Sequence, residues 1–316
     1  MRRGYSIQER SFIRFGISTM KLIHCQWPDL KVPSGYQVIS TDIKSMSALE
    51  IERVEIYIPR YMGGVSTLQE IEKFPHLTLV QLLTAGYDDA LPYIRKGVRL
   101  SNARGVHDYS TAELALGLIT HHIIGIRGYV ADMSSWTWND TQRDSLLGKK
   151  VAIVGAGAIG RQIEKFLSPL NIDCTFFGRS TREDIHSISE LTEMIGDFDI
   201  VILILPLTKE SRGLISTREL SMMKDGALLV NLARGAIVDT EALVAELKRG
   251  RISAALDVTD PEPLPSTHEL WRLPNVVITP HVGGNSKAFE PQARAFCEKQ
   301  LERFVATGEL SNEIEI

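Results

Sequence analysis

The length of 316 residues predicts two domains, because it is about twice the usual size of one domain. A hydrophobic share of 44% and a charged share of 23% are typical of a soluble globular protein. The net charge of −4 and the lack of long basic runs argue against nucleic acid as the main partner, and no apolar run is long enough for a membrane span.

Three cysteines, Cys25, Cys174 and Cys297, show no metal-ligand spacing and leave one unpaired. They favour a reducing compartment, so we expect a cytoplasmic protein without a bound metal. Residues 1–19 are rich in arginine and serine, as transit peptides are, but we expect a disordered extension ahead of the strand that starts at Met20.

Residues 20–102 alternate short apolar runs with polar, helix-compatible segments. The apolar runs are Leu22–His24, Gln37–Ile39, Val54–Ile58, Leu77–Leu83 and Val98–Leu100. This alternation predicts a parallel, doubly wound sheet. It contains no glycine-rich phosphate loop, so we expect it to shape a substrate pocket. The candidate stretch is Leu83 to Asp88, small residues past a strand's carboxyl end, with an ordinary strand-to-helix turn as the alternative.

A helix is predicted to follow. Ser110-Thr111-Ala112-Glu113 has the pattern of a capping box that opens a helix running through Ile123. Apolar residues lie on almost all of its faces, which predicts burial between the two domains.

The stretch VAIVGAGAIG, from Val151 to Gly160, predicts a dinucleotide site. Four apolar residues form a short buried strand, and three glycines in the spacing G-x-G-x-x-G lead into an amphipathic helix. The glycines allow a tight turn, close approach of a pyrophosphate, and packing of the helix on the strand, while the first helical amides face the phosphates. The predicted contacts are Gly155, Gly157, Ala158, Ile159 and Gly160.

From there the strand-helix alternation is regular. Strands are predicted at 151–155, 174–177, 200–205, 228–232, 253–258 and 276–279. Ser187-x-x-Glu190 and Ser216-x-x-Glu219 have the capping-box pattern, and Asp239 can cap a helix that Gly250 ends. Six strands suit a Rossmann sheet.

The last predicted helix, about 288–307, crosses back to the first domain. We therefore expect a discontinuous substrate domain, residues 20–102 and 287–316, around a Rossmann nucleotide domain of residues 103–286.

Polar side chains follow three of the later strands. Arg234 follows one strand, Asp257 and then Glu262 follow the next, and His281 follows the last. Carboxyl ends of parallel strands share one edge of a sheet, where the nicotinamide would lie. A cation, a carboxylate and an imidazole there predict a substrate anchor, a group that tunes a pKa and a proton donor.

The turn after Phe177 predicts NADP(H) rather than NAD(H). An acidic side chain there would bind the ribose 2′-hydroxyl and repel a 2′-phosphate. This chain instead has Gly178, Arg179 and Ser180, with Arg182 close behind. A basic surface turn is the alternative.

In order along the chain, LLGKKVAIVGAGAIGR, LPLTKESRGLI, LLVNLARGAIVDTEALVAEL, ALDVTDPEPLP and LPNVVITPHVGG resemble the motifs of the D-isomer-specific 2-hydroxyacid dehydrogenases, which include glyoxylate/hydroxypyruvate reductases. The resemblance covers nearly all of the chain except roughly the first fifty residues. It implies a flavodoxin-like substrate domain, a cleft that closes on hinges, and a homodimer built on the nucleotide domain.

The resemblance also implies roles for single residues. Arg234 would hold the substrate carboxylate and polarise the keto oxygen, His281 would be the acid/base, and Glu262 its carboxylate partner. The residues implied to bind cofactor are Pro206, Ala233 and Asp257, and those implied to bind substrate through backbone amides are Leu83, Ala85 and Gly86.

The expected reaction is hydride transfer between NAD(P)(H) and a small 2-keto acid or D-2-hydroxy acid. A glutamate at Glu262, where formate dehydrogenases of the family would carry glutamine, argues against formate. One alternative is a non-catalytic, dinucleotide-sensing interaction protein, like the corepressors that share this fold. Another is a dehydrogenase of a phosphorylated sugar acid or of phosphite, for which Arg60 and Arg104 would supply extra cations.

Overall fold

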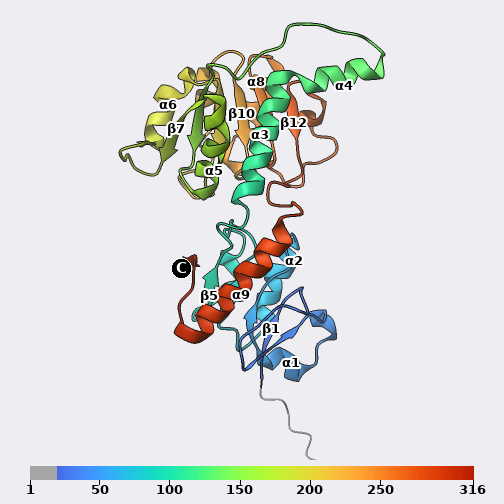
Figure 1. The fold of residues 1–316 in the computed structure, drawn as a ribbon, viewed down its shortest axis with the longest axis vertical. Helices are drawn as coiled ribbons and strands as arrows, with labels where there is room; N and C mark the ends of the chain where they lie inside the picture. Colours follow the sequence, from blue (N-terminus) through green and yellow to red (C-terminus); the bar gives the residue numbers. More distant parts are fainter. Residues whose placement is uncertain (1–19) are drawn as a thin grey trace, which may run out of the picture.

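The structure is a computed structural model and describes residues 20–316, so the expected disorder of residues 1–19 lies outside the described part of the chain. Within that part the strands form two sheets, one of six strands and one of seven (Figure 1). Helices cover both sheets. The predicted fold class, two doubly wound and mostly parallel α/β units, is confirmed.

The first sheet has the strand order β13-β5-β4-β3-β1-β2. Its parallel strands are β1 (Lys21–His24), β2 (Tyr36–Ile39), β3 (Val54–Tyr57), β4 (Leu79–Gln81) and β5 (Arg99–Ser101). All five lie in the predicted apolar runs or overlap them. The sixth strand, β13 (Glu313–Ile314), pairs antiparallel with β5 and was not predicted, because two residues carry no detectable pattern.

Three helices pack around the first sheet: α1 (Ala48–Arg53), α2 (Gly64–Gln69) and α9 (Phe289–Thr307). In α9 the buried side chains Phe289, Ala293, Cys297 and Leu301 are spaced by four residues, so they form one stripe. This stripe packs in one cluster with residues of β1, β3 and β4. The C-terminal helix therefore completes the core of the first unit.

The second sheet has the order β12-β11-β10-β9-β6-β7-β8. Its strands are β6 (Lys150–Val154), β7 (Asp173–Gly178), β8 (Ile185–Ser187), β9 (Ile200–Leu203), β10 (Leu228–Asn231), β11 (Ser253–Leu256) and β12 (Val276–Ile278), all paired in parallel. The chain runs outward in both directions from β6, which places the switch point of the topology beside the strand of the glycine motif. The short strand β8 is additional to the six predicted.

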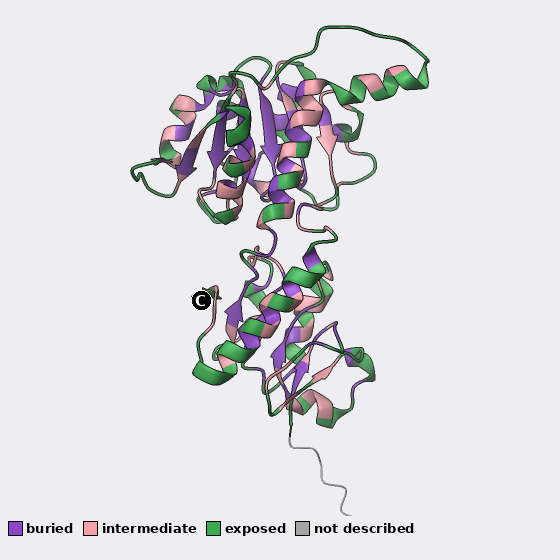
Figure 2. Ribbon diagram, viewed as in Figure 1, coloured by how far each residue is buried: buried purple, intermediate pink, exposed green. Residues whose placement is uncertain are grey.

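Helices lie on both faces of the second sheet. They are α3 (Asp108–Ile124), α5 (Ala158–Leu167), α6 (Leu191–Met194), α7 (Thr217–Met222) and α8 (Thr240–Lys248). Val151 and Ile153 pack toward α3 and α5, whereas Ala152 and Val154 pack toward α6, α7 and α8. This alternation follows from the two-residue period of a strand. Figure 2 shows the central strands of this sheet as buried, whereas β12 at its edge is mostly intermediate.

The predicted capping boxes at Ser187 and Ser216 are present, and Asp239 caps α8 by accepting from the Ala242 N–H. The predicted box at Ser110 is wrong. The helix α3 begins earlier, at Asp108, so Ser110 lies inside its first turn and its hydroxyl donates to the His107 carbonyl.

A projecting segment, here called the arm, comprises α4 (Ile126–Ser134) and residues 135–147. It leaves α3 at Gly125, whose φ of 74° lies in the left-handed region that favours glycine, and it extends away from the second sheet (Figure 1). No single helix within residues 20–316 is long and apolar enough to span a membrane. The pair α3 and α4 meets that test only together, across a bend of 63°.

Candidate active site

The glycine loop between β6 and α5 has the shape that a dinucleotide phosphate needs. Gly155 has φ 126°, and a Cβ there would lie 2.2 Å from the Ile204 carbonyl oxygen. A Cβ on Gly160 would lie 2.2 Å from the Gly155 carbonyl oxygen, so the helix can approach the strand only with glycine there. No atom of residues 20–316 lies within 4 Å of a Cβ position on Gly157, which leaves space for a ligand beside the first amides of α5, at Ala158.

The turn after β7 carries basic side chains and no acidic one at its first positions. Gly178 ends β7, and Arg179 and Ser180 follow as exposed residues. Within residues 20–316 Arg179 forms no ion pair, whereas the nearby Arg161 is held by Asp184 and stacks 4.0 Å from the ring centre of Phe176. The guanidinium of Arg179 is thus free to meet a ligand at the edge of β7.

A cleft of about 560 Å³ lies between the two units, at the carboxyl ends of β4, β10 and β11. Eight of the predicted site residues line it: Leu83, Ala85, Gly86, Ile159 from the glycine loop, Arg234, Asp257, Glu262 and His281. The residues predicted to bind the dinucleotide and those predicted to act on the substrate therefore border one space.

Arg234 stands at the end of β10 on a loop shaped by the buried Asn231. The amide of Asn231 donates to the Arg234 carbonyl and accepts from the Ala233 N–H. The guanidinium then crosses to the first unit, where Nε and Nη2 donate to the two carboxylate oxygens of Asp88 at 3.2 and 3.0 Å. Nη1 donates to the Ala233 carbonyl. Asp88 was in the predicted stretch but had no predicted role.

His281 and Glu262 form a close pair. Nδ1 of His281 lies 2.6 Å from Oε1 of Glu262, and because an ionised carboxylate can only accept, Nδ1 carries the proton. The hydrogen bond to Glu262 raises the pKa of His281, more than burial and the Arg234 charge lower it. Burial alone would raise the pKa of Glu262, but the bond and the charge of His281 lower it. Each of the two shifts favours the charged form of its group.

Asp257 is a support for the loop that carries His281. Its side chain is 3% exposed, and it accepts from Thr279 Oγ1 at 2.5 Å and from the N–H groups of Val282 and Gly283 at 2.9 Å each. The N–H of His281 also donates to the Asp257 carbonyl, which fixes the left-handed backbone of His281 (φ 53°). Through these hydrogen bonds the Asp257 carboxylate orients the loop that carries His281.

The predicted substrate loop lies at the cleft with its backbone exposed to it. Leu83 lines the cleft but is 2% exposed, and its carbonyl accepts from His107 Nε2. Ala85 and Gly86 line the cleft, and neither N–H donates to another residue within the described chain. A Cβ on Gly86 would lie 1.7 Å from Nη2 of Arg234, so the guanidinium rests directly on this loop.

The remaining predicted residues are less central. Pro206 is exposed after β9, and Ala233 is buried beside Arg234. Arg60 lines the cleft, but Arg104 is not among its lining residues, so the two cations considered for a phosphate group are not brought together there.

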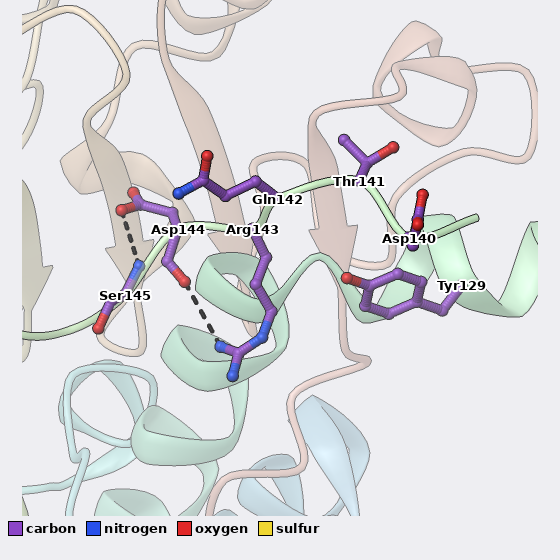
Figure 3. Close-up of a pocket in the computed structure, with 7 residues that line it drawn as sticks. All are labelled: Tyr129, Asp140, Thr141, Gln142, Arg143, Asp144 and Ser145. Carbon is purple, nitrogen blue, oxygen red and sulfur yellow. Dashed lines mark hydrogen bonds between the residues drawn. The ribbon is translucent and has the colours of Figure 1, made fainter.

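A second hollow lies within the arm itself, lined by Tyr129 and by residues 140–145 (Figure 3). It contains none of the predicted site residues. Ser145 donates its N–H to the Asp144 carboxylate at 2.7 Å, a contact within the arm itself.

Comparison with known proteins places these features in context. Residues 116–283 match the model of a family described as D-isomer specific 2-hydroxyacid dehydrogenase, NAD binding domain. The chain is 34% identical over 233 residues to the glyoxylate reductase of Pyrococcus horikoshii, which covers 68% of this chain and 69% of that protein.

Two solved structures share the fold over most of their length. One is an NADPH-dependent glyoxylate/hydroxypyruvate reductase from Sinorhizobium meliloti in complex with NADP and sulfate, with a TM-score of 0.80 and 22% identity over 94% of this chain and 98% of that one. The other is D-lactate dehydrogenase from Aquifex aeolicus with NAD and lactic acid, with a TM-score of 0.74 and 21% identity over 93% of this chain and 100% of that one.

Proposed function

Since the chain belongs to the D-isomer specific 2-hydroxyacid dehydrogenase family, we propose that it reduces a small 2-keto acid of the glyoxylate or hydroxypyruvate type to the D-2-hydroxy acid. The proposal rests on one observation: Arg234 and the Glu262–His281 pair line the same cleft, and the glycine loop borders that cleft too. The similarity to a glyoxylate reductase supports the substrate class.

Each of the three side chains has a role in this reaction. Bound dinucleotide supplies the hydride. Negative charge then builds on the keto oxygen, and the preplaced guanidinium of Arg234 stabilises it. His281 gives a proton to that oxygen from Nε2, because Nδ1 is occupied by Glu262. Glu262 keeps His281 protonated.

The substrate carboxylate is proposed to bind Arg234 and the N–H groups of Ala85 and Gly86. These amides face the cleft without a partner in the described chain, beside the guanidinium. A carboxylate there would accept charge-assisted hydrogen bonds from both units at once. Its arrival would therefore favour closure of the cleft between the proposed substrate domain, residues 20–102 and 287–316, and the proposed nucleotide domain, residues 103–286.

NADP(H) is the proposed cofactor. Gly178 leaves no carboxylate to bind a 2′-hydroxyl, and Arg179 and Ser180 are exposed at the end of β7. The glycine loop is compatible with either dinucleotide, so the choice rests on this turn alone.

A homodimer through the nucleotide domain is also proposed, with the arm as part of the contact. The arm exposes Val130, Met133, Trp136, Trp138 and Leu147, with Trp136 96% and Trp138 95% exposed. Large apolar side chains gathered on one projection are typical of a surface that a partner covers.

The proposed reaction is tested by assaying NADPH and NADH oxidation with glyoxylate, hydroxypyruvate and phenylpyruvate, and by determining the chirality of the product. Turnover of at least one keto acid to the D-hydroxy acid is expected. Dinucleotide binding without turnover of any of them would instead favour the non-catalytic, dinucleotide-sensing alternative.

A further inference from the structure

We propose that Asp88 is a positioning residue for Arg234, an inference that rests on the proposed keto-acid reduction. Asp88 follows β4 of the first unit and Arg234 follows β10 of the second, 146 residues away. Their bidentate ion pair therefore bridges the cleft. Both side chains are 24% exposed, so the pair is largely shielded from water.

The donors of Arg234 can be counted. A guanidinium has five N–H groups in one plane. Nε–H and one Nη2–H go to the two oxygens of Asp88, and one Nη1–H goes to the Ala233 carbonyl. Within residues 20–316, one N–H on Nη1 and one on Nη2 remain without an acceptor. These two are available for a carboxylate oxygen and the adjacent keto oxygen of a 2-keto acid.

Asp88 thus determines which edge of the guanidinium the substrate meets. An arginine side chain has several rotatable bonds, and fixing it costs conformational free energy that the ion pair supplies before substrate binds. The contact of Nη2 with Gly86 restrains the group on its other side, and Thr84 Oγ1 holds that loop by donating to the Gly86 carbonyl at 2.7 Å. Asp88 acts on the reaction through Arg234 and needs no contact with the substrate.

The variant Asp88→Asn keeps the shape of the side chain but removes its charge and turns one acceptor into a donor that faces Arg234. We expect kcat/KM with glyoxylate to fall by about ten- to a hundredfold, the usual size of coupling within one hydrogen-bonded network. Asp88→Glu, which keeps the carboxylate, is expected to fall between Asp88→Asn and wild type. Asp29→Asn, which breaks an exposed ion pair with Arg294 outside the cleft, is the matched control.

A double-mutant cycle with Arg234→Lys separates positioning from a general structural effect. If Asp88 acts through the guanidinium, Asp88→Asn costs little further activity once Arg234 is lysine. The Kd for NADPH, measured by fluorescence, is expected to stay within about twofold of wild type, because Asp88 lies in the other unit from the glycine loop. Additive losses in the cycle, or a loss confined to cofactor binding, would overturn the proposal.

Two further outcomes are distinguishable. A lower KM and higher kcat/KM in Asp88→Asn would show that Asp88 competes with the substrate for Arg234, which also overturns the proposal. If wild type turns over no keto acid, the proposed function fails, and titration of oxamate into the NADPH complex then decides the role of Asp88. Weaker oxamate binding in Asp88→Asn but not in the Arg234→Lys background supports positioning, and unchanged binding overturns it.

Discussion

Nδ1 of His281 lies 2.6 Å from Oε1 of Glu262, at the end of a loop that the buried Asp257 holds in place. The pair turns the ring so that Nδ1 is engaged and Nε2 is left for the substrate. It also raises the pKa of His281, so the protonated form persists to higher pH than in a free histidine.

The first prediction follows from that shift. Keto-acid reduction requires protonated His281, so activity is lost as pH rises through its pKa. Glu262→Gln removes the charge that raises this pKa, and the high-pH limb of kcat should move to lower pH. The pH profile of kcat in wild type and variant measures the shift. A limb that stays in place would mean that Glu262 only supports the loop.

The second prediction concerns Arg234. Arg234→Lys keeps a positive charge but loses the planar fork, so it can no longer bridge Asp88 and the substrate. We expect kcat/KM to fall by about a hundredfold or more, the effect of removing an oxyanion donor. Arg249→Lys, at an exposed side chain that follows α8 and pairs with the buried Glu246, is the control. Steady-state kinetics with near wild-type values for Arg234→Lys would remove this residue from the mechanism.

The third prediction concerns cofactor choice. A hydrogen bond to a charged group contributes about 1.5–3 kcal/mol, which corresponds to about ten- to a hundredfold in selectivity. The ratio of kcat/KM for NADPH to that for NADH should fall by that factor in Arg179→Ala. Arg303→Ala, in α9 of the other unit, should leave the ratio unchanged. A wild-type preference for NADH would show that the turn after β7 does not bind a phosphate.

The fourth prediction concerns the arm. Placing a charge at its most exposed side chains, in the double variant Trp136→Glu and Trp138→Glu, should convert a dimer to a monomer, because burying two carboxylates is costly. Sedimentation velocity measures the change. Leu49→Glu, an exposed apolar position in α1, is the control. A variant that stays dimeric would place the contact elsewhere on the protein.

The candidate site can be predicted largely because the carboxyl ends of parallel strands lie at one edge of a sheet. Arg234, Glu262 and His281 each come soon after an apolar run, and strand ends of one sheet necessarily meet at one edge. The ion pair of Asp88 with Arg234 could not be predicted from the sequence, for a physical reason. Its partner lies in the other unit, and nothing in the stretch LTAGYDD shows which of two adjacent aspartates turns toward it.

The errors in the fold have local causes. The pattern at Ser110 is that of a capping box, but a helix can start earlier wherever the backbone allows it, and α3 starts at Asp108. The strands β8 (IHS) and β13 (EI) are short and lack the apolar run that marks equally short strands such as β4 and β12. Long, strongly patterned segments were predictable, whereas short edge strands depend on neighbours that the sequence does not reveal.

The return of α9 to the first sheet has a consequence for synthesis on the ribosome. Gln300 donates to Gln81 and Ser101, which precede it by 219 and 199 residues, and Arg99 pairs with Glu313 across 214 residues. At a translation rate of about 5–20 residues per second, α9 is made roughly 10 to 40 s after the first sheet, whose face it covers. The later-made unit, whose strands and helices all lie between Asp108 and Ile278, can close on itself before then. The second unit can therefore finish folding before the first, although it is made later, and the nascent first sheet is the part that a chaperone would have to shield.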